Sequence, residues 1–387
     1  MKDEETVDSA DGVGGMFTGV PQHENFPLLK DIFPTVRMEA AATPFPFPDG
    51  SPCEPPETYV FGAWSRSSEA FHDETDTVAL LVLQDGAVRH ERYTLTGGRD
   101  VHWISWSVAK SFISALVGIA VAEGAIPSIE APISDVVAGL GGSGYDGVRI
   151  EDILQMSSGA SWNEDYSDPD SDVSRLGAVM SGELTLDELV TSISPDVPPG
   201  SLCRYNSADT QALGSLLVAA TGTSIADYMQ EKLYNPLGME SPGYWLTDSA
   251  GREMAFGGLL LTARDFAKLG ELYRRGGEWD GAQVVPAQWV TASTRADAPH
   301  LAAGAPAGDT TDIGYGYQWW LPAGDRGDYT AIGVYNQFVY VDPASRSVIV
   351  KLSANRTYGT TASEESDREL ETIAYLRAIA DQLTRTS

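Results

Sequence analysis

Two strand–turn–strand patterns lie near opposite ends of the chain, and they constrain the fold more than any other feature. In "TVALLVLQDGAVRHERYTL", strand-like runs at about 77–84 and 87–94 flank the turn dipeptide Asp85-Gly86. In "NQFVYVDPASRSVIVKLSAN", the turn falls at 342–346. The order of hairpin, helix, helical region, hairpin and terminal helix predicts an α+β fold. In this fold both ends of the chain build one antiparallel sheet, with a large helical insertion between them.

The segments between and after the hairpins show helical periodicity. From Ser105 onward, apolar residues recur at three- and four-residue spacing, and Gly124 can end that helix. Residues 130–250 carry short helical patterns broken by Pro and Gly, without convincing strands, and 363–383 places its apolar residues on one helical face. We therefore expect three parts: an N-terminal extension of extended or loop structure (1–56), an α/β domain (57–130 plus 251–387) and a helical domain (131–250).

The charge and cysteine content exclude several classes of protein. The chain has 55 Asp and Glu against 25 Lys and Arg, a net charge of −30, which disfavours nucleic acid and anionic membranes as partners. Cys53 and Cys203 are the only cysteines, too few for a disulfide framework or a four-thiolate zinc site. The N-terminal segment lacks an apolar run, and no stretch approaches ~18 consecutive apolar residues. We expect a soluble cytoplasmic protein.

Ser107 and Lys110 form the only S-x-x-K pair in the chain. On a helix, positions i and i+3 share a face, so the two side chains would lie one turn apart. A serine hydroxyl needs a base to act as a nucleophile, and a lysine can be that base if burial keeps it neutral. We expect the neighbouring apolar residues to bury this amine, because an ammonium there is costly unless it is used. The alternative is a surface lysine whose stem lies along an amphipathic helix.

Other nucleophile signatures are absent from the sequence. No G-x-S-x-G motif occurs, and the five histidines, at 23, 72, 90, 102 and 300, form no H-x-x-x-H pair. His102 is close to Ser107 in the sequence, but we expect a structural role for it. The Ser107–Lys110 pair is therefore the leading candidate for covalent catalysis.

Six ordered segments carry a resemblance to a known family. They are "SWSVAKSFISALVGIAVAEGAI", "VRIEDILQMSSGASW", "RYNSADTQALGSLL", "LYNPLGM", "GGLLLTARDFAKLG" and "AIGVYNQFVYVDP". Together they resemble the serine β-lactamase and penicillin-binding-protein superfamily, in its class C and esterase branch, over about 75–385. "SWNEDYSDPDSD", "YGYQWW" and "GVYNQF" are most similar to the 6-aminohexanoate-dimer (nylon oligomer) hydrolases. The resemblance implies a β-lactamase-like fold.

The resemblance also implies the residues of the site. Ser107 would be the nucleophile, with Lys110 and Tyr205 carrying its proton, and we expect the pKa of Tyr205 to be depressed beside Lys110. The oxyanion hole would be the backbone N–H groups of Ser107 and Val334. The substrate would contact Tyr166 and Trp320. We interpret the acidic run "NEDYSDPDSD" as a solvated loop whose carboxylates could attract the ammonium end of a substrate.

Two positions depart from the family pattern. Ser207 stands where the Y-x-N motif has Asn, and Ala331 stands where the K/H-T-G strand has Lys or His. Because that Lys or His helps to hold the carboxylate of a β-lactam, its replacement disfavours a penicillin-directed activity.

Three functions stay open at this stage. They are a hydrolase of short linear amides, a carboxylesterase with the same residues, and a catalytically silent ligand-binding module. The expected partner is a small-molecule amide or ester, and a homodimer is left open. No metal or organic cofactor is implied.

Overall fold

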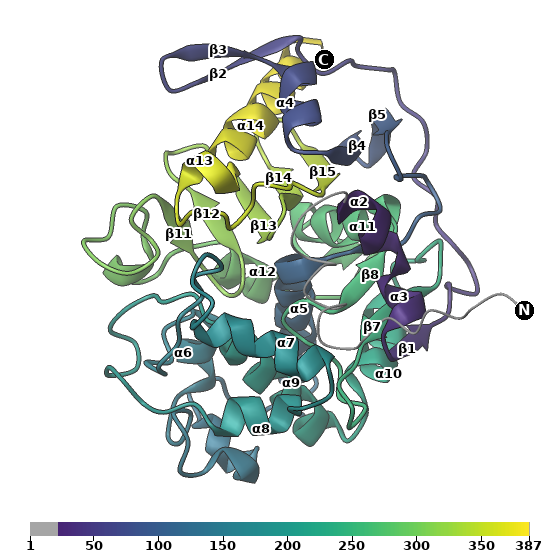
Figure 1. Ribbon diagram of the computed structural model, residues 1–387. Helices are drawn as coiled ribbons and strands as arrows, with labels where there is room; N and C mark the ends of the chain where they lie inside the picture. Colours follow the sequence, from purple (N-terminus) through teal and green to yellow (C-terminus); the bar gives the residue numbers. More distant parts are fainter. Residues whose placement is uncertain (1–21, 387) are drawn as a thin grey trace, which may run out of the picture.

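The computed structural model describes residues 22–386, and its largest element is a seven-stranded sheet (Figure 1). Its strands are β4 (Thr77–Gln84), β5 (Ala87–Tyr93), β11 (Ile313–Tyr315), β12 (Trp320–Pro322), β13 (Tyr329–Gly333), β14 (Gln337–Asp342) and β15 (Ser347–Ser353). They lie in the order β11-β12-β13-β14-β15-β4-β5, and each neighbouring pair is antiparallel. The pairing of β15 with β4 joins the two ends of the chain, so the predicted α+β arrangement is confirmed.

Both predicted hairpins are present, and their turns have the expected backbone geometry. Asp85 and Gly86 join β4 to β5 with positive φ angles of 51° and 76°, as a two-residue hairpin turn requires. Between β14 and β15, Arg346 adopts a φ of 56°. Local turn chemistry therefore fixes the registers on which the rest of the sheet is built.

Helices cover the sheet on both faces (Figure 1). Leu81 of β4 packs in a cluster with α11 (Ala263–Arg274), whereas Leu80 packs in a cluster with α14 (Glu369–Thr386). Helix α4 (Ser68–Glu74) lies on the α14 side. Because successive side chains of a strand point to opposite faces, a strand buried on both sides must be apolar at every position. This explains the continuous apolar run of β4.

The segment between the two contributions to the sheet is mostly helical. Helix α5 (Ala109–Ala122) is buried along most of its length and packs against α9 (Ser207–Thr221). The side chain of Asn206 caps α9 by accepting hydrogen bonds from the N–H groups of Ala208 and Asp209. The remaining helices of residues 126–386 are η3 (Ile133–Asp135), η4 (Ala138–Leu140), α6 (Ile150–Leu154), η5 (Asp172–Arg175), α7 (Leu176–Met180), α8 (Leu186–Thr191), α10 (Ile225–Met229), η6 (Gln230–Tyr234), α12 (Ala287–Ser293), η7 (Pro299–Leu301) and α13 (Glu364–Asp367).

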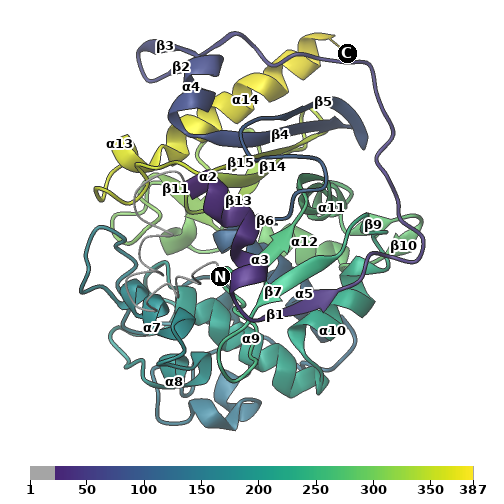
Figure 2. The same cartoon turned by 45° about the vertical axis from the view of Figure 1, so that its right-hand side comes forward.

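A second, four-stranded sheet was not expected from the sequence (Figure 2). Its strands are β1 (Thr35–Met38), β7 (Gly243–Leu246), β8 (Leu259–Leu261) and β6 (Trp103–Ile104), in that order. The predicted extended segment is extended at β1, where it pairs within this sheet, whereas the prediction of a region without strands is wrong for β7. Strands this short are stabilised by non-local pairing, here Val36 opposite Trp245, which a sequence pattern does not show.

The N-terminal region contains further short elements. Helices α2 (Gln22–Asn25), η1 (Phe26–Leu28) and α3 (Leu29–Ile32) precede β1, so the prediction of extended or loop structure is wrong for this segment. Residues 1–21 of the predicted extension lie outside the described residues. Two small hairpins complete the strands, β2 (Thr58–Phe61) with β3 (Trp64–Ser67) and β9 (Glu278–Trp279) with β10 (Ala282–Gln283). The division into an α/β domain and a helical domain stays a prediction. Within residues 22–386, every helix is too short or too polar to cross a membrane.

Candidate active site

Ser107 lies in the short 3₁₀ turn η2 (Trp106–Val108), directly before α5. Trp106 has a φ of 43°, an unfavourable conformation for a residue with a bulky side chain. Trp106 lies between the end of β6 and the start of α5. The side chain of the next residue, Ser107, lines a cavity. Ser107 is 9% exposed, so most of its surface is buried although it lines the cavity.

The end of β13 packs closely against this turn. A Cβ atom added at Gly333 would come within 2.5 Å of the Ser105 carbonyl oxygen and 3.1 Å of the Ser107 nitrogen, so only glycine fits. Val334 follows directly and lines the same cavity as Ser107. The two segments that carry the predicted oxyanion hole are therefore adjacent, and the hole itself stays a prediction.

Lys110 is fully enclosed, and its amine contacts three oxygen atoms. The Nζ atom lies 2.8 Å from Ser107 Oγ, 3.1 Å from Ser207 Oγ and 3.0 Å from the carbonyl oxygen of Phe256. The residue is 1% exposed, so the alternative of a surface lysine is wrong. Burial lowers the pKa of Lys110 to about 8, although the charge of Glu164 opposes this shift. An amine with this pKa is partly neutral near pH 7 and can accept a proton.

Glu164 is the residue of the site that sequence reasoning missed. Its Oε1 atom accepts hydrogen bonds from the hydroxyls of Ser207 (2.6 Å) and Tyr166 (2.8 Å). Its Oε2 atom accepts from the backbone N–H of Ser207 (3.0 Å) and from the indole N–H of Trp162. The interpretation of the acidic run as a solvated loop is therefore wrong for this one carboxylate.

The only sequence signal for Glu164 was its position between two aromatic residues at i−2 and i+2. Trp162 is buried and Tyr166 lines the cavity, so the side chain between them is held close to the nucleophile. The other acids of the run behave as expected: Asp170 is exposed, and Asp165 caps the backbone N–H of Ser167. Composition alone does not distinguish these carboxylates.

Tyr205 stands over the amine of Lys110. The distance from Nζ to the centre of its ring is 4.9 Å. Burial and the charge of Glu164 raise the pKa of Tyr205 well above its usual value, and a hydrogen bond with Ser107 offsets this only in part. The predicted depression of the pKa of Tyr205 is therefore wrong, because burial of the ring and, second, the charge of Glu164 both favour the neutral phenol. Tyr205 is a neutral phenol at physiological pH.

Trp320 and its neighbour point in different directions. The ring of Trp320 stacks on Tyr205 with centroids 5.2 Å apart and an interplanar angle of 21°, and it lines the cavity. Trp319 is fully buried and packs against Tyr273 and Tyr329. Adjacent residues at the start of a strand face opposite sides, as expected from the pleat. Of the two, Trp320 is the one that can contact a substrate.

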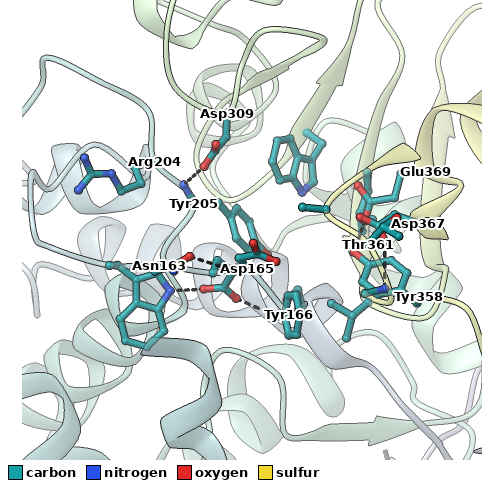
Figure 3. Close-up of a pocket in the computed structure, with 18 residues that line it drawn as sticks. Asn163, Asp165, Tyr166, Arg204, Tyr205, Asp309, Tyr358, Thr361, Asp367 and Glu369 are labelled. Atoms are coloured by element: carbon teal, nitrogen blue, oxygen red, sulfur yellow. Dashed lines mark hydrogen bonds between the residues drawn. The ribbon is translucent and has the colours of Figure 1, made fainter. Parts of the chain in front are cut away.

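The cleft at Ser107 has two sides of different polarity. A cavity of about 530 Å³ carries most of the charged groups (Figure 3), namely Glu164, Asp165, Asp309, Asp367, Glu369 and Arg204. A second cavity of about 650 Å³ shares Ser107, Tyr166 and Val334 with the first. Its walls are mainly apolar and include Trp106, Leu176, Met180, Met254 and Phe256. Within residues 22–386, no group of three or more His, Cys, Asp or Glu side chains could hold a metal ion.

Comparisons with known proteins agree with this geometry. A family model described as beta-lactamase matches residues 68–374. A curated relative, the 6-aminohexanoate-dimer hydrolase of Paenarthrobacter ureafaciens, is 31% identical over 298 residues, covering 73% of this chain and 74% of that protein.

Solved structures share the fold at lower identity. A protein from Bacillus anthracis, provisionally named a 6-aminohexanoate-dimer hydrolase, has a TM-score of 0.86 at 22% identity, with 100% of this chain and 99% of the other covered. EstCE1, a hydrolase with promiscuous acyltransferase activity, has a TM-score of 0.62 at 17% identity, with 82% of this chain and 96% of the other covered. The β-lactamase-like fold implied by the sequence motifs is thus confirmed.

Proposed function

Because this chain belongs to the beta-lactamase family, we propose that it is a serine hydrolase that cleaves short linear amides through an acyl-enzyme on Ser107. The observation that carries the proposal is the 2.8 Å contact between the Lys110 amine and the Ser107 hydroxyl inside a buried site. A nucleophile and a desolvated base at hydrogen-bond distance are the minimum that covalent acyl transfer requires.

In the proposed reaction, Ser107 Oγ attacks the carbonyl carbon while its proton moves to Lys110 Nζ. The neutral amine of Lys110, with its pKa of about 8, is a better base than the Tyr205 phenol, whose pKa is raised. The oxyanion would be held by the backbone N–H groups of Ser107 and Val334, each worth about 3 kcal/mol in the transition state. The C–N bond then breaks, and the leaving nitrogen takes a proton from the Tyr205 hydroxyl, which Lys110 replenishes. Water releases the acyl group by the reverse sequence.

The preference for a linear amide rests on the curated relative and on the shape of the cleft. That relative is named for hydrolysis of the 6-aminohexanoate dimer, an amide with a charged amino end. Here Asp165, Asp367 and Glu369 line one side of the cleft and could attract an ammonium group, while the apolar side could hold an aliphatic chain. Tyr166 borders both sides, so it is the proposed contact to the substrate amide.

Carboxylesterase activity is the second candidate function. The fold is shared with EstCE1 and with a family VIII carboxylesterase, and the apolar cavity next to Ser107 suits an acyl chain. Esters have better leaving groups than amides, so the same residues could cleave them with less help from a proton donor.

The decisive experiment compares two substrates and one variant. We expect turnover of 6-aminohexanoate dimer and slower or comparable turnover of p-nitrophenyl butyrate, with both lost in Ser107→Ala. A fluorophosphonate probe should label Ser107 in the folded protein, as mass spectrometry of the labelled peptide would show. Full hydrolysis by Ser107→Ala would refute the proposal, and ester turnover without amide turnover would favour the second candidate.

A further inference from the structure

We propose that Glu164 and Ser207 form a positioning pair that orients the Lys110 amine and sets the pH range in which it acts as a base. This inference rests on the proposed function, because it assigns how the base of that reaction is prepared. Ser207 is the residue that stands where the Y-x-N motif has Asn.

The hydrogen bonds run in one direction through Ser207. The Lys110 amine lies 3.1 Å from Ser207 Oγ, and the Ser207 hydroxyl donates its single proton to Glu164 Oε1 at 2.6 Å. A hydroxyl has one proton and two lone pairs, so donation to the carboxylate leaves a lone pair for the amine. The backbone N–H of Ser207 also donates to Glu164, at 3.0 Å, which fixes the orientation of the carboxylate against the start of α9.

Glu164 is itself held in place on its other edge. The hydroxyl of Tyr166 and the indole N–H of Trp162 donate to its two oxygen atoms, so four donors converge on one carboxylate. Such a carboxylate has little capacity left for a substrate ammonium. Its charge is instead fixed at a constant position, two hydrogen bonds from the amine, where it stabilises the ammonium that forms when Ser107 is deprotonated.

The other groups that contact the Lys110 amine are neutral. Lys110 also faces the Phe256 carbonyl and ring, the Tyr205 ring and the Ser107 hydroxyl, all neutral groups. The carboxylate of Glu164 acts electrostatically on Tyr205, Asp209, Asp309 and Tyr166 as well. Removing the charge of Glu164 should therefore make the Lys110 ammonium easier to deprotonate. It should also leave the hydrogen-bond chain from Lys110 through Ser207 without an anionic end.

The first test measures the rate of fluorophosphonate labelling of Ser107 as a function of pH, which does not depend on the natural substrate. In Glu164→Gln we expect the rise of the rate to occur about one pH unit lower than in the wild type, since an anion near the amine is lost. Asp170→Asn is the matched control, because it removes one charge from the same loop at an exposed position. An unshifted profile in Glu164→Gln, or an equal shift in Asp170→Asn, would overturn the inference.

The second test addresses orientation. Ser207→Ala should lower the labelling rate by about tenfold at every pH, and Ser207→Thr, which keeps a hydroxyl, should restore it to within about threefold. Thermal melts would establish that both variants fold. Wild-type labelling by Ser207→Ala would overturn the inference while the proposed function stands. If the wild type itself is not labelled, the proposed function fails, and the positioning role fails with it.

Discussion

Two lysines, Lys110 in the cleft and Lys351 in the seven-stranded sheet, are both buried beside hydroxyl groups, but only Lys110 has a neighbouring hydroxyl that lines a cavity. Both are almost completely shielded from solvent, and burial lowers the pKa of both amines. The amine of Lys351 donates to Thr75 Oγ1 at 3.2 Å and to Ser353 Oγ at 2.6 Å, and it lies 5.0 Å from the centre of the Phe71 ring. Neither of those hydroxyls belongs to the cleft.

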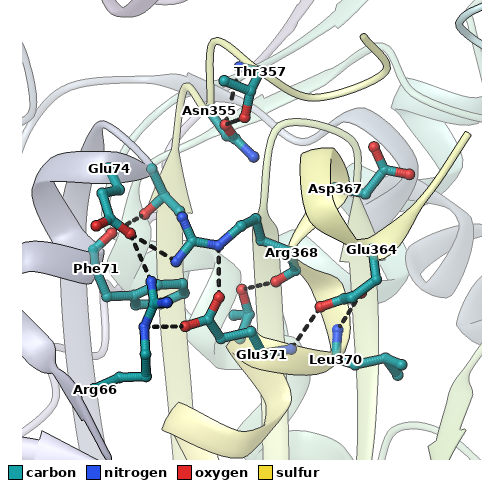
Figure 4. Close-up of polar contacts among 12 residues, drawn as sticks. Arg66, Phe71, Glu74, Asn355, Thr357, Glu364, Asp367, Arg368, Leu370 and Glu371 are labelled. Atoms are coloured by element: carbon teal, nitrogen blue, oxygen red, sulfur yellow. Dashed lines mark hydrogen bonds and ion pairs between the residues drawn. The ribbon is translucent and has the colours of Figure 1, made fainter. Parts of the chain in front are cut away.

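The charges near Lys351 are already balanced without it. Glu371 forms ion pairs with Arg368 (2.6 Å) and Arg66 (3.2 Å), and Arg368 also pairs with Glu74 (2.9 Å), which ties β3, α4 and α14 together (Figure 4). At Lys110, by contrast, the nearby carboxylate of Glu164 accepts hydrogen bonds from the neutral groups of Ser207, Tyr166 and Trp162, and it reaches the amine through Ser207. The two sites thus differ in which charges surround the amine.

The burial of lysines outside the cleft contradicts one expectation from the sequence. We expected a buried amine to be tolerated only where it is used, yet Lys351 and Lys268 are also fully buried. Aromatic rings and carbonyl or hydroxyl oxygens stabilise them, as the contacts of Lys268 with Phe45 illustrate. Burial and a lowered pKa are therefore not sufficient evidence for catalysis. The additional requirement is a hydroxyl that is both within hydrogen-bond reach of the amine and open to a cavity.

The largest difference between the two lysines should appear on substitution by methionine. Lys110→Met removes the proposed base, and we expect kcat/KM to fall by about 10⁴-fold. The free energy of unfolding should change by less than about 2 kcal/mol, since a buried amine is replaced by an apolar side chain of similar length. Steady-state kinetics and urea denaturation measure the two quantities. Retention of more than about a tenth of the activity would remove Lys110 from the mechanism.

Tyr205→Phe should have the second largest effect. The proposed proton donor to the leaving group is lost, and we expect the acylation rate to fall by about 10³-fold with the amide substrate. The stacking of the ring on Trp320 is kept, so the melting temperature should stay close to that of the wild type. Single-turnover measurements with amide and ester substrates give the test. An equal loss with both substrates would argue against a role in leaving-group protonation.

The sequence predicted the parts of this molecule that depend on neighbours along the chain. The hairpins of β4–β5 and β14–β15 follow from turn residues and apolar alternation, and the Ser107–Lys110 pair follows from helical spacing. The strand β1 and the inward-facing Glu164 could not be predicted in this way. Both are defined by contacts across a large sequence separation, β1 with β7 and Glu164 with Ser207.

The direction of the pKa shift of Tyr205 depends on burial and on a contact that the sequence did not reveal. Beside an ammonium alone, a phenol would lose its proton more easily, which was the basis of the prediction. Because the ring is buried, and because the charge of Glu164 acts in the same direction, the pKa of Tyr205 is raised instead of lowered. Lys110 stays the proposed base, and Tyr205 keeps its proton and is the proposed acid.

The dependence of kcat/KM on pH should be smaller than the effects of these two substitutions, and its direction follows from the pKa of Lys110. Lys110 must be neutral to accept the proton from Ser107, and its pKa is lowered to about 8. The rate should therefore rise with pH and level off above pH 8. We expect an increase of about 50-fold in kcat/KM between pH 6 and pH 8. A flat profile over this range would mean that the amine is not the titrating base.

Lys351→Met should have the smallest effect on activity, and it tests the difference between the two lysines most directly. We expect kcat/KM to stay within about twofold of the wild type, because Glu371 keeps both of its arginine partners and the sheet keeps its register. Since the variant removes a desolvated amine, the free energy of unfolding should be unchanged or higher, by up to about 2 kcal/mol. Urea denaturation and steady-state kinetics under the conditions used for Lys110→Met provide the matched measurement. A loss of activity similar to that of Lys110→Met would show that the sheet and the cleft are energetically coupled, and a neighbouring hydroxyl open to a cavity would then no longer distinguish the two lysines.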